Sequence, residues 1–285
     1  MIYGGYAQDE LDRQYDAAST VPSLQPFLER WSADSARTRA ELDNETAAYG
    51  EHERERLELF PAARAGAPLF VFIHGGYWRR LDASYFSFVA GPVVRAGGAC
   101  ALFTYPLAPA SSLDAIVAAV RRGFTWLGTH AERRLNASPQ RIVVGGHSAG
   151  GQLAGMLAAT DWAAHGLDPH SVGGVFGLSG LYDLEPVRRA NVNEWLRLPD
   201  AAAAERNSPQ SHPPHAPVPV IAAAGQCESD EFRRQSQAYA RACAAAGCNA
   251  TYLEPAGHNH YTIVEQLGDP ATELSALLLG LLGLA

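Results

Sequence analysis

This chain of 285 residues contains no lysine, and all 22 of its basic residues are arginine. A Schiff base with pyridoxal phosphate or with a carbonyl substrate requires a lysine amine, so those mechanisms are excluded. A phosphate-binding loop that ends in Gly-Lys-Ser/Thr is excluded as well, and so are hydrolases that use a lysine base. If the chain is a nucleophilic enzyme, its base must be a histidine or a carboxylate.

Cysteine, positive charge and long apolar runs are also scarce. The four cysteines form no Cys-x-x-Cys pair, which excludes a zinc ribbon or a thioredoxin-like motif, and such sparse usage fits a reducing compartment. The formal net charge of −8 argues against a nucleic-acid-binding protein. No stretch approaches the roughly 18–20 uncharged apolar residues of a membrane helix, and the N-terminus shows no leader pattern. We therefore expect a cytoplasmic protein that binds neither nucleic acid nor membranes.

Short apolar runs alternate with longer helical patterns along most of the chain. The runs LFVFIH at 69–74 and RIVVG at 141–145 have the continuous apolar character of strands buried on both faces. Further strands are expected at 54–60 (an edge strand), 99–105, 172–178, 218–224 and 250–253. Helices are expected at 82–96, 111–135, 149–160, 230–246 and 262–282. This alternation predicts an α/β fold in which helices flank a mostly parallel central sheet.

Two segments stand outside this alternation. Residues 1–50 are polar and helix-prone, and we interpret them as an N-terminal helical arm that folds over the rest of the chain. Residues 181–215 are rich in Pro, Ala and Asn. They are too long for an ordinary connection and too short for a domain, so we expect a small lid-like insert. Because no repeat or linker is visible, residues 1–285 are expected to form a single α/β domain.

The pentapeptide GHSAG at 146–150 matches Gly-x-Ser-x-Gly and lies between an expected strand and an expected helix. A sharp turn at this point lifts the Ser148 hydroxyl off the end of the sheet, and the flanking glycines avoid collisions with neighbouring backbone. The start of the helix also places free N–H groups beside the serine. The pattern alone is common in Gly-rich loops, but its position predicts Ser148 as a nucleophile.

The segment HGGYW at 74–78 directly follows the buried strand. In the α/β-hydrolase arrangement, N–H groups of such a loop and of the residue after the nucleophile bind the oxyanion of the tetrahedral intermediate. We therefore expect Gly76, Tyr77 and Ala149 to form an oxyanion hole. His74 precedes the serine in the chain and is interpreted as orienting this loop. A Gly-Gly turn beside core aromatics is the alternative interpretation.

The acid of an α/β-hydrolase follows the serine in the chain and lies just after a late strand. After the strand expected at 218–224, the chain offers Glu228, Asp230 and Glu231. Asp230 and Glu231 hold first-turn positions where carboxylates complement a helix dipole, which favours Glu228. Asp183, after the preceding strand, is a second candidate.

The histidine of this order must come from GHNHY at 257–261, beyond the last strand. The bare pattern does not separate His258 from His260. A His-x-His metal pair is the competing interpretation, but no third ligand occurs at a suitable spacing. We therefore expect neither a metal nor a cofactor.

Together these motifs resemble the kynurenine formamidase (arylformamidase) family of α/β-hydrolases over essentially the whole chain. The most specific element is the HGGxW loop, since related hormone-sensitive-lipase-like esterases usually carry HGGG or HGGA there. The segments RQYD at 13–16 and SGLYDL at 179–184 also resemble the family. This resemblance implies the α/β-hydrolase fold.

The same resemblance bears on the acid and the histidine. The family's acid segment is similar to ESDEFRRQS at 228–236, in which Glu228 takes the place of an aspartate. The family's His-Phe-x-Ile-Ile-Glu pattern corresponds to HYTIVE at 260–265, so the resemblance selects His260 over His258.

The resemblance implies hydrolysis of a small aryl formamide, N-formylkynurenine, to kynurenine and formate through Ser148, His260 and Glu228. Tyr77 and Trp78, beside the oxyanion glycines, are expected to bind the arylamine, with core packing an equal alternative for Trp78. A carboxylesterase for small aryl or short-acyl esters would use the same residues, and a catalytically silent binding module is the more distant alternative. The Ala-rich segments leave a homodimer open.

Overall fold

The computed structural model describes residues 1–285, the side chain of Arg141 excepted, and it centres on one eight-stranded sheet. The strands are β1 (Glu45–Ala48), β2 (Arg56–Phe60), β3 (Ala67–Ile73), β4 (Ala99–Thr104), β5 (Ala137–His147), β6 (Val172–Leu178), β7 (Val220–Ala223) and β8 (Ala250–Leu253). They lie in the order β1-β2-β4-β3-β5-β6-β7-β8. The β1–β2 and β2–β4 pairs are antiparallel and all the others are parallel. The predicted mostly parallel sheet is confirmed.

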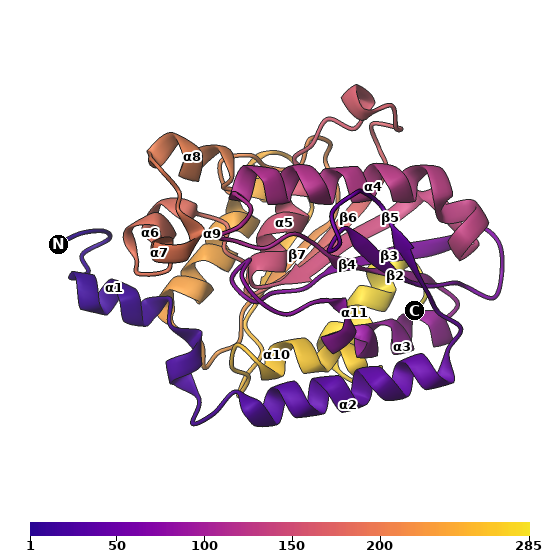
Figure 1. Ribbon diagram of the computed structural model, residues 1–285, viewed down its shortest axis with the longest axis horizontal. Helices are drawn as coiled ribbons and strands as arrows, with labels where there is room; N and C mark the ends of the chain where they lie inside the picture. Colours follow the sequence, from indigo (N-terminus) through magenta and orange to yellow (C-terminus); the bar gives the residue numbers. More distant parts are fainter.

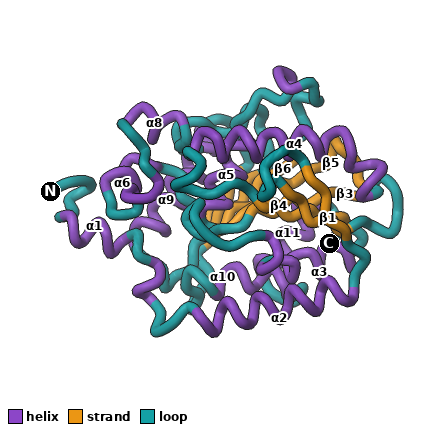
Figure 2. Tube along the Cα trace, in the orientation of Figure 1, coloured by secondary structure: helices purple, strands orange, loops and turns teal.

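Helices cover both faces of this sheet, and the strands form a central layer between them (Figures 1 and 2). The α-helices are α1 (Gln8–Gln14), α2 (Gln25–Glu41), α3 (Ala90–Arg95), α4 (Leu113–Leu135), α5 (Ala149–Ala158), α6 (Leu184–Arg189), α7 (Asn193–Leu196), α8 (Ala201–Arg206), α9 (Asp230–Ala245), α10 (Thr262–Glu265) and α11 (Glu273–Leu282). Helices α4 and α5 lie on one face, α3 and α11 on the other, and α2 lies outside the second group (Figure 1).

The strands with the most continuous apolar sequence occupy the middle of the sheet. Every residue of β3 is buried, because α/β crossovers cover both of its faces. The strand expected at 54–60 is present as β2, but its prediction as an edge strand is wrong. Strand β1 pairs outside it, at the end of a segment expected to be helical. The sequence ETAA of β1 has only four residues, two of them alanine, so it shows no pattern that predicts a strand.

Two predicted helices differ from the observed ones at Gly, Ser and Pro positions. The helix expected at 82–96 begins as two short 3₁₀ turns, and only α3 is α-helical. The helix expected at 262–282 is divided into α10 and α11 near Gly268 and Pro270, where helix propagation is unfavourable. Helix α4 begins as its sequence predicts, since the Ser112 side chain accepts a hydrogen bond from the N–H of Ala115.

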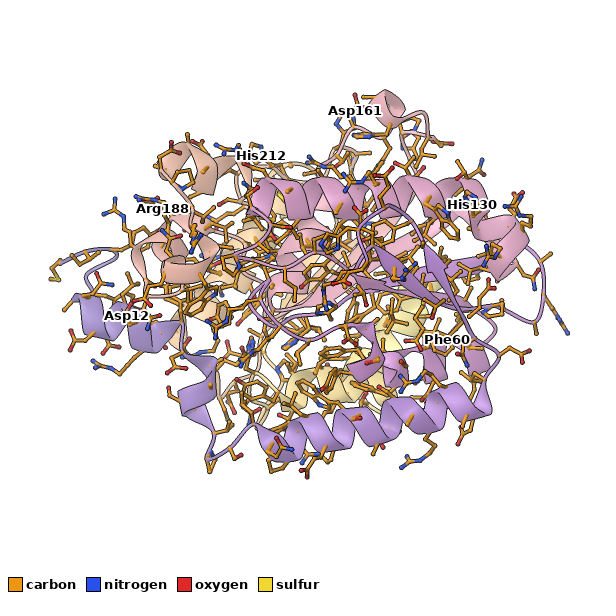
Figure 3. All side chains as sticks on the ribbon, in the orientation of Figure 1. Asp12, Phe60, His130, Asp161, Arg188 and His212 are labelled. Atoms are coloured by element: carbon orange, nitrogen blue, oxygen red, sulfur yellow. The ribbon has the colours of Figure 1, made fainter. Side chains whose placement is uncertain are left out.

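The N-terminal arm and the 181–215 insert lie against each other at one end of the molecule. Figure 3 shows Asp12 of α1 and Arg188 of α6 at this end. The Asp12 carboxylate accepts a 2.7 Å hydrogen bond from the N–H of Asn191, and the Gln8 side chain donates to the carbonyl of Arg189 at 2.8 Å. Helices α6, α7 and α8 make up the insert. In the described part of the chain, no helix combines the length and apolarity needed to cross a bilayer.

The turn between β5 and α5 packs directly against the end of β3. A Cβ atom at Gly150 would lie only 1.9 Å from the carbonyl oxygen of Ile73. Both partners are backbone of central elements, so no side-chain rotation relieves that overlap. The first turn of α5 therefore requires glycine in order to lie this close to the sheet.

We expect Gly150→Ala to lower the free energy of unfolding by about 3 kcal/mol or more, because the overlap forces α5 away from β3. Gly280→Ala is the matched control. Gly280 is an exposed residue of α11, and a methyl group added there would meet no atom within 4 Å, so alanine is expected to stabilise the protein by about 0.5–1 kcal/mol. Urea denaturation of both variants measures the two values. Equal effects of the two substitutions would contradict the close approach.

Candidate active site

Ser148 occupies the sharp turn where β5 ends and α5 begins. Its backbone has φ 58° and ψ −121°, a strained conformation for a residue with a side chain. A 2.8 Å hydrogen bond from its N–H to the carbonyl of Leu178 ties the turn to β6. This geometry is the strand-to-helix elbow that the GHSAG sequence predicts, and Ser148 lines a cavity at the carboxyl ends of the parallel strands.

His260 and Glu228 form a buried hydrogen-bonded pair beside this elbow. The Nδ1 atom of His260 lies 2.7 Å from Oε2 of Glu228, and the side chains are 6% and 1% exposed. The second carboxylate oxygen accepts two further 2.6 Å hydrogen bonds, from the hydroxyl of Ser179 and the N–H of Gly225. Three donors therefore hold the Glu228 carboxylate, as a buried charge requires.

The other candidate carboxylates have different partners. Asp183 caps the start of α6 through the N–H of Glu185 and accepts a hydrogen bond from Tyr3. Asp230 and Glu231 lie in the first turn of α9 and form ion pairs with arginines one turn later. Of these candidates and Glu228, only Glu228 bonds to a histidine ring within the described residues.

The two candidate histidines are also separated by the fold. The ring of His260 packs between Phe232, at 4.4 Å between centroids, and Tyr261, at 5.5 Å. The Nδ1 atom of His258 is buried and has no hydrogen-bond partner in the described part of the chain. Nor do the described residues gather three His, Cys, Asp or Glu side chains around either histidine at metal-binding distances.

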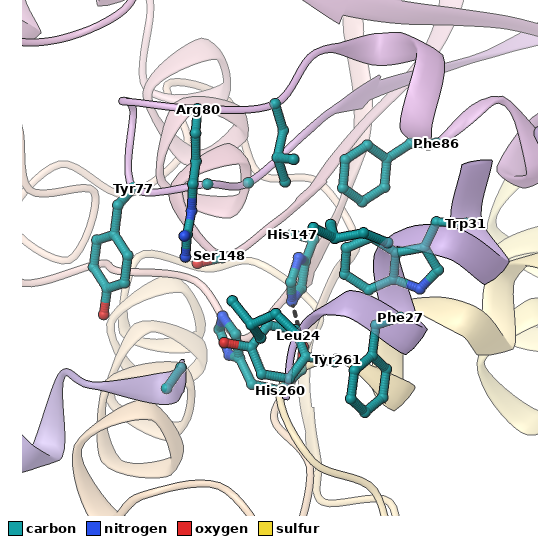
Figure 4. Close-up of a pocket in the computed structure, with 15 residues that line it drawn as sticks. Leu24, Phe27, Trp31, Tyr77, Arg80, Phe86, His147, Ser148, His260 and Tyr261 are labelled. Atoms are coloured by element: carbon teal, nitrogen blue, oxygen red, sulfur yellow. Dashed lines mark hydrogen bonds between the residues drawn. The ribbon is translucent and has the colours of Figure 1, made fainter. Parts of the chain in front are cut away.

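Ser148 and His260 line the same cavity (Figure 4). No hydrogen bond joins the Ser148 hydroxyl to the imidazole among the described atoms. In substrate-free hydrolases this contact is commonly long and tightens when substrate binds.

The loop after β3 borders the same cavity and forms part of its wall. Gly76, Tyr77 and Trp78 all have positive φ angles, of 107°, 53° and 53°. The N–H groups of Gly76, Tyr77 and Ala149 have no acceptor among the described residues, and Gly76 and Tyr77 line the cavity with Ser148. Free N–H groups beside a nucleophile are what an oxyanion site requires.

Two buried, neutral histidines support this wall. Burial lowers the pKa of His74 to about 4, and its Nδ1–H donates to the carbonyl of Gly75 at 2.6 Å. Burial, followed by the neighbouring His260, holds the pKa of His147 well below its usual range. The Nε2–H of His147 donates to the carbonyl of His260 at 2.8 Å and so anchors the loop that carries the imidazole.

The contacts of His147 and Ser179 are not predicted by the sequence motifs. His147 is the variable residue of Gly-x-Ser-x-Gly, a position the motif leaves free. Ser179 directly follows β6, whose carboxyl end lies next to that of β7, so its hydroxyl reaches the Glu228 that follows β7. A polar residue at the end of the neighbouring strand is the signal that points to Ser179.

The two aromatic residues of the HGGYW loop have different positions. Tyr77 lines the cavity, and its hydroxyl donates to the carbonyl of Tyr15 in the N-terminal arm. Trp78 is fully buried, and its indole N–H donates to Gln152 of α5 at 3.0 Å. These contacts favour the core-packing alternative for Trp78, because the close packing of α5 beneath the loop turns its ring into the core.

The cavity beside Ser148, called here the first cavity, has a volume of about 60 Å³. The N-terminal arm supplies much of its apolar wall through Leu24, Phe27 and Trp31, and Phe86 and Tyr261 complete the aromatic side (Figure 4). Residues 181–215 do not contribute to its lining; they border a second cavity through Asn191, Val192 and Trp195.

Comparisons with known proteins agree with this geometry. A family model for the alpha/beta hydrolase fold matches residues 70–264. The chain is 32% identical to a kynurenine formamidase of Danio rerio, with 97% of each chain covered. It is 33% identical to one of Salmo salar, over 82% of this chain and 80% of that protein. A solved structure of a candidate thioesterase from Silicibacter sp. TM1040 has 29% identity and a TM-score of 0.79 and covers 94% of this chain and 98% of its own.

The buried state of His74 predicts acid sensitivity. Between the ordinary histidine pKa of 6.5 and the folded-state value of about 4, the unfolded chain binds a proton that the folded chain excludes. The free energy of unfolding should therefore fall as the pH falls through this range, by up to about 3 kcal/mol from this residue.

His74→Gln should reduce this dependence, because glutamine does not titrate. Urea-denaturation midpoints at pH 7.5 and pH 5 measure it, and His212→Gln, at an exposed position, is the matched control. A wild-type pH dependence in His74→Gln would contradict the assignment, since the slope would then arise elsewhere.

Proposed function

Because this chain belongs to the kynurenine formamidase family of α/β-hydrolases and is a hydrolase, we propose that it cleaves the aryl formamide N-formylkynurenine to kynurenine and formate. The observation that carries the proposal is the buried 2.7 Å contact between His260 and Glu228 beside the Ser148 elbow. The two fish relatives named kynurenine formamidase support the choice of substrate.

The first half of the reaction is formyl transfer to the enzyme. His260 takes the proton of Ser148, whose oxygen attacks the formyl carbon. The N–H groups of Gly76, Tyr77 and Ala149 bind the resulting oxyanion, and each such donor contributes roughly 10²–10³ to turnover. As the C–N bond breaks, His260 returns the proton to the leaving aniline nitrogen. The arylamine of an anilide is a better leaving group than the alkylamine of an alkyl amide. An esterase-like site is therefore sufficient to cleave the formamide.

The second half releases formate. A water molecule loses a proton to His260 and attacks the formyl ester of Ser148, and the serine oxygen regains that proton when it leaves. In both halves Glu228 accepts the Nδ1–H of His260, which keeps Nε2 free to act as the base and stabilises the imidazolium. The hydrogen bonds from Ser179 and Gly225 keep this carboxylate in position.

The first cavity suits an aromatic acyl donor. Phe27, Trp31, Phe86 and Tyr261 present ring carbons to it, and Trp31 and Phe86 lie 5.2 Å apart between centroids. An arylamine ring buries its apolar surface against such a wall. Of the two residues predicted to contact the arylamine, Tyr77 and Trp78, Tyr77 borders the first cavity.

A carboxylesterase for small aryl or short-acyl esters is the second candidate function. The candidate thioesterase among the similar structures favours it, since ester and formamide hydrolysis use the same nucleophile, base and oxyanion donors. A catalytically silent binding module is disfavoured, because a binding module has no need of a strained serine or of free backbone amides beside it.

Turnover of N-formylkynurenine and of p-nitrophenyl acetate by wild type and Ser148→Ala separates the three functions. We expect wild type to cleave the formamide, and we expect Ser148→Ala to lose activity on both substrates by more than about 10⁴-fold, because the nucleophile is gone. Cleavage of the ester with no cleavage of the formamide would refute the formamidase proposal. Equal activity of the variant and wild type would refute the serine mechanism.

Glu228→Gln tests the identity of the acid. Glutamine keeps the size of the side chain but does not stabilise the imidazolium or its tautomer, so kcat/KM on the preferred substrate should fall by roughly 10²–10⁴-fold. Asp183→Asn is the matched control, since asparagine caps a helix as well as aspartate does and should leave kcat/KM within about threefold of wild type. A larger loss in Asp183→Asn than in Glu228→Gln would assign the acid to Asp183.

A further inference from the structure

Two adjoining cavities meet at the loop after β3. The first cavity, beside Ser148, has a volume of about 60 Å³, and the second has a volume of about 270 Å³. Tyr77 and Arg80 line both. The two cavities therefore adjoin at these two side chains, and a molecule too long for the first would reach the second by passing them.

The two cavities differ in chemistry. The first is walled mainly by aliphatic and aromatic side chains, whereas Asp16, Arg79, Arg80 and Asn191 bring charged and polar groups to the second. A ligand that spans both would be apolar at the end near Ser148 and charged at the other end.

Arg80 is placed to bind an anion. In Figure 4 its side chain extends from the loop in the direction of Ser148, on the opposite side of the first cavity from Trp31 and Phe27. Its guanidinium takes no hydrogen-bond or ion-pair partner among the described residues. The neighbouring Arg79, by contrast, stacks on the ring of Trp195 at 4.2 Å from its centroid.

Asp16 brings the opposite charge to the second cavity. One of its oxygens accepts a 3.3 Å hydrogen bond from the N–H of Ser19 at the start of a short 3₁₀ helix. Within the described part of the chain it pairs with no arginine, although Arg79 and Arg80 border the same cavity. An unpaired carboxylate and an unpaired guanidinium around one space fit a ligand that carries both charges.

We propose that the second cavity binds the α-amino-acid end of the substrate, with Arg80 on the carboxylate and Asp16 on the ammonium group. This inference rests on the proposed function, which places the formyl group at Ser148 and the aromatic ring in the first cavity. The amino-acid end then passes Tyr77 and reaches the second cavity. Because the chain has no lysine, arginine provides the carboxylate contact, and its planar guanidinium can make two parallel hydrogen bonds to one carboxylate.

Equilibrium binding to three related ligands tests the proposal without requiring turnover. The ligands are L-kynurenine, 3-(2-aminobenzoyl)propanoate, which lacks the ammonium group, and 2-aminoacetophenone, which lacks both charged groups. Calorimetric titration of wild type should give Kd values that rise in this order. Arg80→Gln should weaken binding of the two carboxylate ligands by about tenfold relative to 2-aminoacetophenone.

Asp16→Asn should weaken binding of L-kynurenine relative to 3-(2-aminobenzoyl)propanoate, and asparagine keeps the acceptor for Ser19. Arg64→Gln is the matched control. Arg64 is an exposed arginine between β2 and β3, at the amino ends of the parallel strands, so all three Kd values should stay at wild-type levels.

Equal binding of L-kynurenine and 2-aminoacetophenone by wild type would overturn the proposal. So would an equal loss for all three ligands in Arg80→Gln, which is the result of a merely structural role. The turnover assay with N-formylkynurenine tests the proposed function separately from these binding measurements. A wild type that binds the three ligands in the expected order but leaves N-formylkynurenine intact would refute the formamidase reaction alone.

Discussion

The carboxylate of Glu228 joins the loops that follow three neighbouring parallel strands. It lies after β7, accepts from Ser179 after β6, and bonds to His260 after β8. The carboxyl ends of adjacent parallel strands reach the same edge of a sheet, so side chains far apart in the chain meet there. A buried charge without all of these donors would be costly, and the positions of the three loops are therefore coupled.

A neutral histidine, His147, packs beside this pair. His74 and His147 are fully enclosed by protein, and burial keeps both unprotonated near neutral pH. His147 lies 4.6 Å from His260 between ring centroids, where a second positive charge would oppose an imidazolium. In the proposed mechanism, His260 can then gain and lose its proton without a competing titration beside it.

The N-terminal arm borders both cavities above the sheet, whereas the 181–215 insert borders only the second among the described residues. The arm brings aromatic rings over Ser148, and the insert brings Asn191 and Trp195 to the second cavity. Tyr77 connects the arm to the HGGYW loop after β3 through its hydroxyl. The charged groups of the second cavity come from Asp16 of the arm and from Arg79 and Arg80 of the loop after β3, so this loop and the arm together supply the polar end of the space.

The sequence was sufficient to predict the mostly parallel sheet, the Ser148 turn and the choice between strands and helices in the core. These depend on local properties: apolar runs for strands such as β3, and glycines where α5 lies against the sheet. It also placed Glu228 and His260 just after strands, where the acid and the histidine of a hydrolase lie. The residue patterns alone did not separate Glu228 from Asp183 or His260 from His258.

Only the tertiary structure shows which of these residues meet and what surrounds them. Which carboxylate meets which imidazole depends on where two loops end in space, and the His260–Glu228 contact spans 32 residues. The inward turn of Trp78 depends on Gln152 of α5. The arm's place over Ser148 depends on contacts such as the hydrogen bond from Trp31 to Glu265, 234 residues away. A local pattern carries the conformation of its own segment, whereas these outcomes depend on packing between segments that are distant in sequence.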